Sequence, residues 1–151
     1  MNLITPLLQP GNVLADVETT SKKRLFEQVG QMFLTSHGVA ASEVFDSLFA
    51  REKLGSTALG YGIAIPHGRI KHLGETACAF IRLKTPTDFE APDQLPVDLV
   101  FVLLAPAAAT DIHLQILGEL AAMFSDADFR AKLRNAPDAG ELHRLITEWT
   151  P

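Results

Sequence analysis

The sequence predicts an α/β fold, a three-layer sandwich in which a mixed sheet lies between helical layers. Two observations support this prediction. Residues 97–104 form an almost uninterrupted apolar run, which is typical of a strand covered on both faces. The segments on both sides of this run repeat apolar residues at helical spacing. The expected order is strand, helix, helix, strand, strand, strand, helix, helix, helix, which places helices on both faces of one sheet.

The first strand is predicted at residues 12–17. Thr20 or Ser21 is expected to cap the helix that follows, and Gly38 is expected to end it. Apolar residues at helical spacing define the inward face of this helix: Leu25, Phe26, Val29, Met32 and Phe33.

A second helix is expected from Ser42 to about Arg51. Serine is a typical N-cap, and Glu43 would lie near the positive end of the helix dipole. The inward residues of this helix are predicted to be Val44, Phe45, Leu48 and Phe49.

The middle of the chain is expected to supply the rest of the sheet. Residues 76–84 are rich in β-forming side chains, and residues 97–104 are the candidate for the central strand. Pro106 is expected to end that strand, because proline has no backbone N–H to donate. The glycine-rich segment 55–68 is unsuited to regular helix.

Helices are predicted to complete the chain. Thr110 or Asp111 would begin the first, and the other two are expected at about 126–134 and 138–148. No internal repeat divides the sequence, so we expect a single domain spanning 1–151. The inward residues of the first and last of these helices are predicted to be Ile112, Ile116, Leu117, Leu120, Phe124, Leu142, Leu145, Ile146 and Trp149.

The composition excludes some classes of function. The chain has 151 residues, 47% of them hydrophobic, with a net charge of −5 at pH 7. An acidic chain does not favour nucleic acid, which requires a positive face. Cys78 is the only cysteine, so an internal disulfide is impossible. The longest apolar run, 99–109, is shorter than the ~20 residues of a membrane span. We therefore expect a cytoplasmic protein without membrane insertion.

Segment 51–69 carries residues suited to binding an anion. Its glycines allow backbone N–H groups to approach a ligand, and the hydroxyls of Ser56 and Thr57 can donate to phosphate oxygens. Pro66 fixes its own φ and favours an extended conformation before it, which would hold His67 on a stiff stem.

A histidine in this setting is a candidate nucleophile. With a pKa near ~6.5, His67 is largely neutral and one ring nitrogen offers a lone pair. Arg51 is the leading candidate to neutralise an incoming anion. Further positive charge is available at Lys53, Arg69 and Lys71. Two alternatives stay open: His67 could be a structural turn residue, and these three cations could be solvated surface charge.

A long motif resembles a known family. Arg-Glu-Lys-Leu-Gly-Ser-Thr at 51–57 and Gly-Tyr-Gly-Ile-Ala-Ile-Pro-His-Gly at 60–68 resemble the enzyme IIA family of the phosphoenolpyruvate-dependent phosphotransferase system, fructose/mannitol type. The nearest resemblance is to its nitrogen-regulatory, PtsN-like branch. It covers essentially the whole chain, including the Leu-Leu-Gln-Pro-Gly-Asn-Val-Leu sequence at 7–14, Ser-Lys-Lys-Arg at 21–24 and Pro-Val-Asp-Leu-Val-Phe at 96–101.

The resemblance implies roles for particular residues. It implies that His67 is the phosphorylated residue, through Nε2. It also places Arg51 in the phosphoryl-binding site and makes His113 a second imidazole that faces His67. His113 also falls in the first turn of its predicted helix, where the dipole disfavours imidazolium and free N–H groups favour an anion. Without the resemblance, His113 would be interpreted as a structural histidine. The candidate phosphoryl-binding residues are Ser56, Thr57 and Gly68.

The resemblance also implies partners. A phosphorylated histidine phosphocarrier protein would donate to His67, and the acceptor would be regulatory protein targets or a IIB domain. The protein would be a phosphotransferase-type phosphocarrier with a covalent phosphohistidine intermediate and no cofactor or metal. The sequence has no Gly-x-x-x-x-Gly-Lys-Ser/Thr nucleotide-binding loop, which agrees with a protein donor. Phosphorylation adds about two negative charges, enough to change which partner binds.

Two positions depart from the family pattern. Ala58 stands where glycine is usual, and Tyr61 stands where a small polar residue is usual. Ala58 would raise the energy of a positive φ, and Tyr61 is expected either to crowd the phosphoryl pocket or to cap it.

Other functions remain as alternatives. A sugar-transport IIA component would pass its phosphoryl group to a IIB domain. A metal-dependent hydrolase would use His67 and His113, with Asp111 as a further ligand or Ser56 as the nucleophile. A structural or binding module would use none of these groups chemically.

Overall fold

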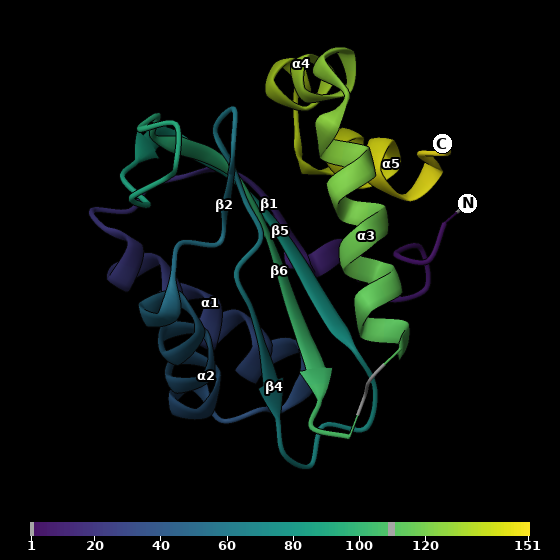
Figure 1. Ribbon diagram of the computed structural model, residues 1–151. Helices are drawn as coiled ribbons and strands as arrows, with labels where there is room; N and C mark the ends of the chain where they lie inside the picture. The colour runs from purple at the N-terminus through teal and green to yellow at the C-terminus, as the bar shows by residue number, and fades with distance from the viewer. Residues whose placement is uncertain (1, 109–110) are drawn as a thin grey trace.

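The computed structural model describes residues 2–108 and 111–151, which form three layers (Figure 1). The helices are α1 Lys22–His37, α2 Ala41–Leu54, α3 Asp111–Ser125, α4 Ala127–Asn135 and α5 Ala139–Glu148. The strands are β1 Val13–Val17, β2 Ala58–Gly60, β3 Ile63–Ala64, β4 His67–Ile70, β5 Ala77–Thr87 and β6 Val97–Pro106, with a short 3-10 helix, Pro10–Asn12, before β1. Helices α1 and α2 cover one face of the sheet, and α3, α4 and α5 cover the other. The predicted α/β sandwich is confirmed.

Strand β6 lies at the centre of the sheet, as its apolar sequence predicts. It pairs antiparallel with β5 along one side. On the other side it pairs parallel with β3 at Leu99 and Val100, and then with β4 from Leu103 to Pro106. The order across the sheet is β1-β5-β6-β3-β2, with β4 beside β6. The sheet is therefore mixed, as expected.

Alternate side chains of β6 enter two separate cores. One set packs with apolar residues of α3, α4 and α5, and the other packs with α1 and α2. Each fully buried side chain of this size stabilises the fold by about 1.5–3 kcal/mol. The two sets are Leu99, Phe101 and Leu103, and Val100, Val102 and Leu104.

Helix α1 has the predicted ends. The hydroxyl oxygen of Ser21 accepts a hydrogen bond of 3.0 Å from the backbone N–H of Arg24. Gly38 adopts a left-handed φ of 68°, and its N–H donates to the Leu34 carbonyl at 3.1 Å.

The predicted start of α2 is wrong. The helix begins at Ala41 with Ala40 as N-cap, and no side chain caps it, so Ser42 lies inside the first turn. A Cβ built on Gly30 would come within 2.7 Å of the Ala41 carbonyl oxygen, so α1 and the start of α2 are in close contact. The local preference of serine for the N-cap position does not include this packing of α2 against α1. The helix also extends three residues beyond Arg51.

The glycine-rich segment is more regular than the sequence suggests. In the described part of the chain, the stretch between α2 and α3 forms strands β2 to β6 rather than the expected three. Strands β2 and β3 make an antiparallel hairpin. Its turn needs positive φ, which is 96° at Gly60, 58° at Tyr61 and 80° at Gly62.

Helix α3 agrees with its predicted stripe except at one end. It begins at Asp111, while Thr110 lies outside the described residues. Ile112 is 44% exposed, so its predicted burial is wrong, because the core contributed by α3 begins only at Ile116. Within the described ranges, no helix is long and apolar enough to cross a membrane.

Gly68 allows β4 to lie directly against α2. A Cβ built at Gly68 would lie 3.1 Å from the Cβ of Ser47 and 3.2 Å from its carbonyl carbon, and it would clash with the Ser47 hydroxyl. The same hydroxyl donates a 3.0 Å hydrogen bond to the Arg69 carbonyl. The position therefore requires glycine for packing.

Gly68→Ala is expected to destabilise the protein by about 1–3 kcal/mol, because the added methyl group overpacks the contact between β4 and α2. Urea unfolding measures this free energy. Gly74→Ala is the matched control, since a Cβ there meets nothing within 4 Å and its φ is not positive. Equal unfolding free energies for Gly68→Ala and the native protein would contradict the packing argument.

Candidate functional site

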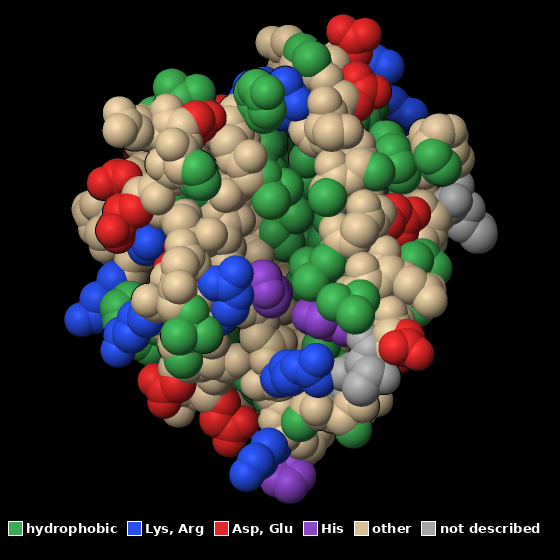
Figure 2. Space-filling view, viewed as in Figure 1, with side chains coloured by type: hydrophobic (Ala, Val, Ile, Leu, Met, Phe, Trp, Pro, Cys, Tyr) green, Lys and Arg blue, Asp and Glu red, His purple; other side chains and the backbone are tan. Residues whose placement is uncertain are grey.

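The C-terminal turn of α2, strand β4 and the first turn of α3 meet at a pocket of about 720 Å³. Arg51, His67, Gly68, Arg69 and His113 all line it. Figure 2 shows this face, with two adjacent histidine side chains near its centre, basic side chains beside them and an apolar groove leading away. The structure thus brings the predicted residues Arg51, His67, Gly68 and His113 together.

His67 begins β4 and is half-buried, and a backbone carbonyl orients its ring. Nδ1 lies 2.8 Å from the Ile65 carbonyl oxygen. Because a carbonyl only accepts, Nδ1 carries the hydrogen and Nε2 keeps its lone pair. The stem before His67, residues 65–66, is itself fixed by two backbone hydrogen bonds. The Ile65 N–H donates to the Thr57 carbonyl at 3.0 Å, and the Pro66 carbonyl accepts from the Leu103 N–H at 3.0 Å. The stiff stem expected from the sequence is present.

Burial lowers the pKa of His67 below its usual 6.5. The hydrogen bond to Ile65 opposes this shift, the positive charge of Arg51 adds to it, and the carboxylate of Glu52 opposes it. The net direction keeps the imidazole uncharged at neutral pH. An uncharged ring with a free Nε2 is the form that can act as a nucleophile.

His113 faces His67 across the pocket. Their ring centroids are 5.9 Å apart and the ring planes are inclined at 52°. His113 is the third residue of α3, and only 6% of it is exposed. Burial lowers its pKa, with further contributions from His67 and Arg69. Two neutral imidazoles therefore lie side by side, and no hydrogen-bond partner is found for Nδ1 of His113 within the described ranges.

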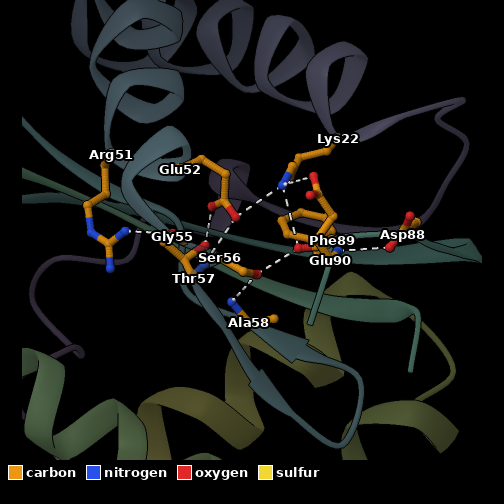
Figure 3. Close-up of polar contacts among 10 residues, drawn as sticks. All are labelled: Lys22, Arg51, Glu52, Gly55, Ser56, Thr57, Ala58, Asp88, Phe89 and Glu90. Atoms are coloured by element: carbon orange, nitrogen blue, oxygen red, sulfur yellow. Dashed lines mark hydrogen bonds and ion pairs between the residues drawn. The ribbon is translucent and has the colours of Figure 1, made fainter. Parts of the chain in front are cut away.

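Two guanidinium groups line the pocket. Arg51 donates from Nη1 to the Gly55 carbonyl at 2.7 Å, which fixes one edge of its planar group (Figure 3). Arg69 donates from Nη1 to the Ala107 carbonyl at 3.1 Å. Together they outnumber Asp46, the acidic residue that also lines this pocket, so an acidic chain has a local excess of positive charge here.

Arg69 lines the candidate pocket, and the sequence left its role undecided. It lies two residues after His67 on β4, and residues i and i+2 of a strand point to the same face. That alternation could have placed Arg69 beside the histidine. Lys53 instead lies over the Phe49 ring at 4.8 Å, and Lys71 is exposed beside a different pocket.

Ser56 and Thr57 line a smaller pocket of about 240 Å³ together with Arg51 and His67. Their hydroxyls already have acceptors (Figure 3). Ser56 donates to the Phe89 carbonyl at 2.6 Å, and Thr57 donates to Oε1 of Glu52 at 2.5 Å. A phosphoryl-binding role for these two hydroxyls stays a prediction, and their present partners count against it.

The two departures from the family pattern leave the pocket open. Tyr61 lines neither pocket at His67, because its ring stacks on the Arg130 guanidinium at 4.4 Å and its N–H donates to Asp93 at 2.8 Å. Ala58 is buried and does not have a positive φ, so the expected strain is absent there.

Other titratable residues lie outside the site. His37 contacts the Ser36 hydroxyl at 2.6 Å, and His143 contacts the Leu8 carbonyl at 2.9 Å. Cys78 is buried in β5, and burial raises the pKa of its thiol. Across residues 2–108 and 111–151, no group of three or more His, Cys, Asp or Glu side chains could hold a metal ion.

Comparison with known proteins identifies the family. A family profile described as "Phosphoenolpyruvate-dependent sugar phosphotransferase system, EIIA 2" matches residues 6–149. The chain belongs to this EIIA 2 family. The resemblance stated for segments 51–57 and 60–68 is confirmed, and with it the identification of the wider family from the sequence.

Relatives of this EIIA 2 chain include nitrogen regulatory proteins. It is 45% identical to the "Nitrogen regulatory protein" of Pseudomonas aeruginosa over 94% of this chain and 93% of that protein. The protein of the same name from Bradyrhizobium diazoefficiens is 41% identical over 95% of this chain and 94% of its own. The crystal structure of nitrogen regulatory protein IIA-Ntr from Neisseria meningitidis matches with a TM-score of 0.92 at 44% identity, covering 97% of this chain and 100% of that one.

Arg51→Ala is expected to raise the pKa of His67, because the guanidinium disfavours the imidazolium form. Nitrogen-detected NMR spectra of the imidazole ring, recorded over a range of pH, measure the pKa of His67. In the native EIIA 2 protein, the midpoint of the protonation that removes the Nε2 lone pair should lie below pH 6.5, and in the variant this midpoint should lie at higher pH than in the native protein. Lys53→Ala is the control and should leave the titration unchanged. A titration at the same or lower pH in Arg51→Ala would contradict the assigned electrostatics.

Proposed function

We propose that this chain accepts a phosphoryl group on Nε2 of His67 from a phosphorylated histidine phosphocarrier protein. We further propose that its phosphorylation state signals to regulatory proteins. One observation carries the proposal: the 2.8 Å contact between Nδ1 and the Ile65 carbonyl leaves Nε2 as the nucleophilic nitrogen of a ring that lines a pocket with two arginines. Family membership supports the same chemistry.

The transfer needs positioning and charge neutralisation more than acid–base chemistry. The N–P bond of the donor phosphoimidazole breaks as the bond from Nε2 of His67 to phosphorus forms, and the donor ring keeps the electron pair. No proton has to leave His67, because its hydrogen is already on Nδ1. Arg51 and Arg69 would balance the phosphoryl charge, and the neutral His113 ring offers a polar contact without adding a proton.

Exposed apolar side chains around the pocket favour docking of another protein. Leu54 is 85% exposed and Leu114 is 67% exposed, and both line the pocket. Leu59, 47% exposed, lines the smaller pocket beside it. A protein that covers these residues would exclude water from His67. Because one ring must receive and release the phosphoryl group, donor and acceptor would use the same face in turn.

The regulatory role is favoured by the relatives named nitrogen regulatory protein, which align over most of their length. The family description names a sugar phosphotransferase system, so transfer to a IIB domain is the second candidate. The hydrolase alternative is less well supported. The described residues contain no group of three or more His, Cys, Asp or Glu side chains that could hold a metal ion, and Ser56 donates to the Phe89 carbonyl rather than to a histidine.

Incubation with phosphoenolpyruvate, the first enzyme of the relay and its phosphocarrier is expected to add one acid-labile phosphoryl group to the native protein. Intact mass spectrometry measures the gain. His67→Ala should gain none, while His143→Ala, which lies on α5, should be labelled like the native protein. Equal labelling of native protein and His67→Ala would place the phosphorylated residue elsewhere.

Arg51→Ala and Arg69→Ala are each expected to slow phosphoryl transfer by about 10- to 150-fold, since a hydrogen bond to a charged group contributes about 1.5–3 kcal/mol. Rapid-quench kinetics measure the rate. Lys71→Ala removes a neighbouring charge that does not line the pocket and should leave the rate unchanged. A native rate in Arg51→Ala would remove Arg51 from the site.

A further inference from the structure

Glu52 is a buried carboxylate directly behind the pocket. It is 5% exposed and lies next to Arg51 in the last turn of α2. Its Oε2 accepts from the Thr57 N–H at 3.0 Å and from Nζ of Lys22 at 3.2 Å, and its Oε1 accepts from the Thr57 hydroxyl at 2.5 Å (Figure 3). A buried charge is unfavourable unless it is paired and hydrogen-bonded, and here it is both.

Glu52 is connected to Arg51 through the turn that follows α2. The two bonds from Thr57 to Glu52 close the turn that follows α2, and the Gly55 N–H adds a third by donating to the Glu52 carbonyl at 3.2 Å. The Gly55 carbonyl within this turn accepts the 2.7 Å hydrogen bond from Arg51. The carboxylate therefore fixes the loop that holds the guanidinium.

Glu52 is also connected to His67, through Thr57 and Ile65. The Thr57 carbonyl accepts from the Ile65 N–H at 3.0 Å, and the Ile65 carbonyl accepts from Nδ1 of His67 at 2.8 Å. Glu52 thus binds the N–H and the hydroxyl of Thr57. The carbonyl of Thr57 holds Ile65, and the Ile65 carbonyl selects the tautomer of His67. One side chain is connected to both groups of the pocket.

Further contacts fasten the turn to its surroundings. Nζ of Lys22 also lies 3.5 Å from the Phe89 carbonyl and 3.4 Å from a carboxylate oxygen of Glu90. The same Phe89 carbonyl accepts from the Ser56 hydroxyl at 2.6 Å. Figure 3 shows these residues converging from α1, from the end of α2 and from the loop at 88–90.

We propose that Glu52, held by Lys22, is a positioning residue for phosphoryl transfer: through Thr57 it sets both the place of the Arg51 guanidinium and the tautomer of His67. It does not touch the phosphoryl group. This inference rests on the proposed function of His67. It differs from a purely structural role, because its loss must alter the ring of His67 and the chemical step, while docking of the donor stays intact.

Glu52→Gln tests the proposal in the full chain, because glutamine keeps the size of the side chain and removes its charge. We expect a folded protein by circular dichroism, an unchanged KM for the phosphocarrier and a kcat of transfer lowered about 10-fold or more. In the unphosphorylated protein, nitrogen spectra of His67 should show a mixture of tautomers in place of the single Nδ1–H form.

Glu90→Gln is the matched control. It removes the same charge from the same Lys22 partner, yet its side chain is 79% exposed and reaches neither Thr57 nor the pocket. Its rate and its His67 spectrum should equal those of the native protein. Lys22→Arg, which keeps the ion pair, should retain most of the rate.

Thr57→Val is the second variant and removes only the hydroxyl bond to Glu52. It should lower kcat by a smaller factor than Glu52→Gln does. If Glu52→Gln does not fold, the kcat and the His67 tautomer of Thr57→Val test the positioning by Glu52. A native kcat and a native tautomer in the folded variants would overturn the proposal, as would an equal loss in Glu90→Gln. If the native protein takes no phosphoryl group, the proposed function fails, while the tautomer spectra still test the positioning by Glu52.

Discussion

The hydrogen bond from Nδ1 of His67 to the Ile65 carbonyl sets the chemistry of the pocket, because it decides which ring nitrogen holds a lone pair. Without it, the two tautomers of a neutral imidazole would compete and neither nitrogen would be committed. The bond depends on an extended stem before His67. Pro66 restrains that stem locally, and its carbonyl accepts a hydrogen bond from the Leu103 N–H, which ties the stem to the central strand.

Strand β6 brings the residues of the pocket together. By pairing with β4 it holds His67 opposite Leu103, and it sends alternate side chains into the two cores that carry α2 and α3. Arg51 on α2 and His113 on α3 come from opposite layers and meet at the edge of the sheet. The pocket is therefore a product of the three-layer arrangement rather than of one continuous motif.

Electrostatics within the pocket differ from those of the chain as a whole. The net charge is −5, yet Arg51 and Arg69 line the pocket and act, after burial, to lower the pKa of the two histidines. Burial and nearby positive charge both disfavour imidazolium. Under the proposed function, the Arg51 guanidinium that helps to keep His67 uncharged would also neutralise an incoming phosphoryl group, so both effects would have one structural origin.

The sequence by itself determined the fold class, the central strand, a helix cap at Thr20 or Ser21, the helix end at Gly38 and the motif that identifies the family. These features depend on local backbone preferences, on apolar periodicity and on a long contiguous pattern. Tertiary structure decided the rest: Ala41 rather than Ser42 begins α2, Ile112 is exposed, and Arg69 enters the pocket. It also decided that the Ser56 and Thr57 hydroxyls bind Phe89 and Glu52. Each of these outcomes depends on which element packs beside the residue, and the local sequence does not state that packing. The alternation that places Arg69 beside His67 can be used only once residues 67–70 are known to form a strand.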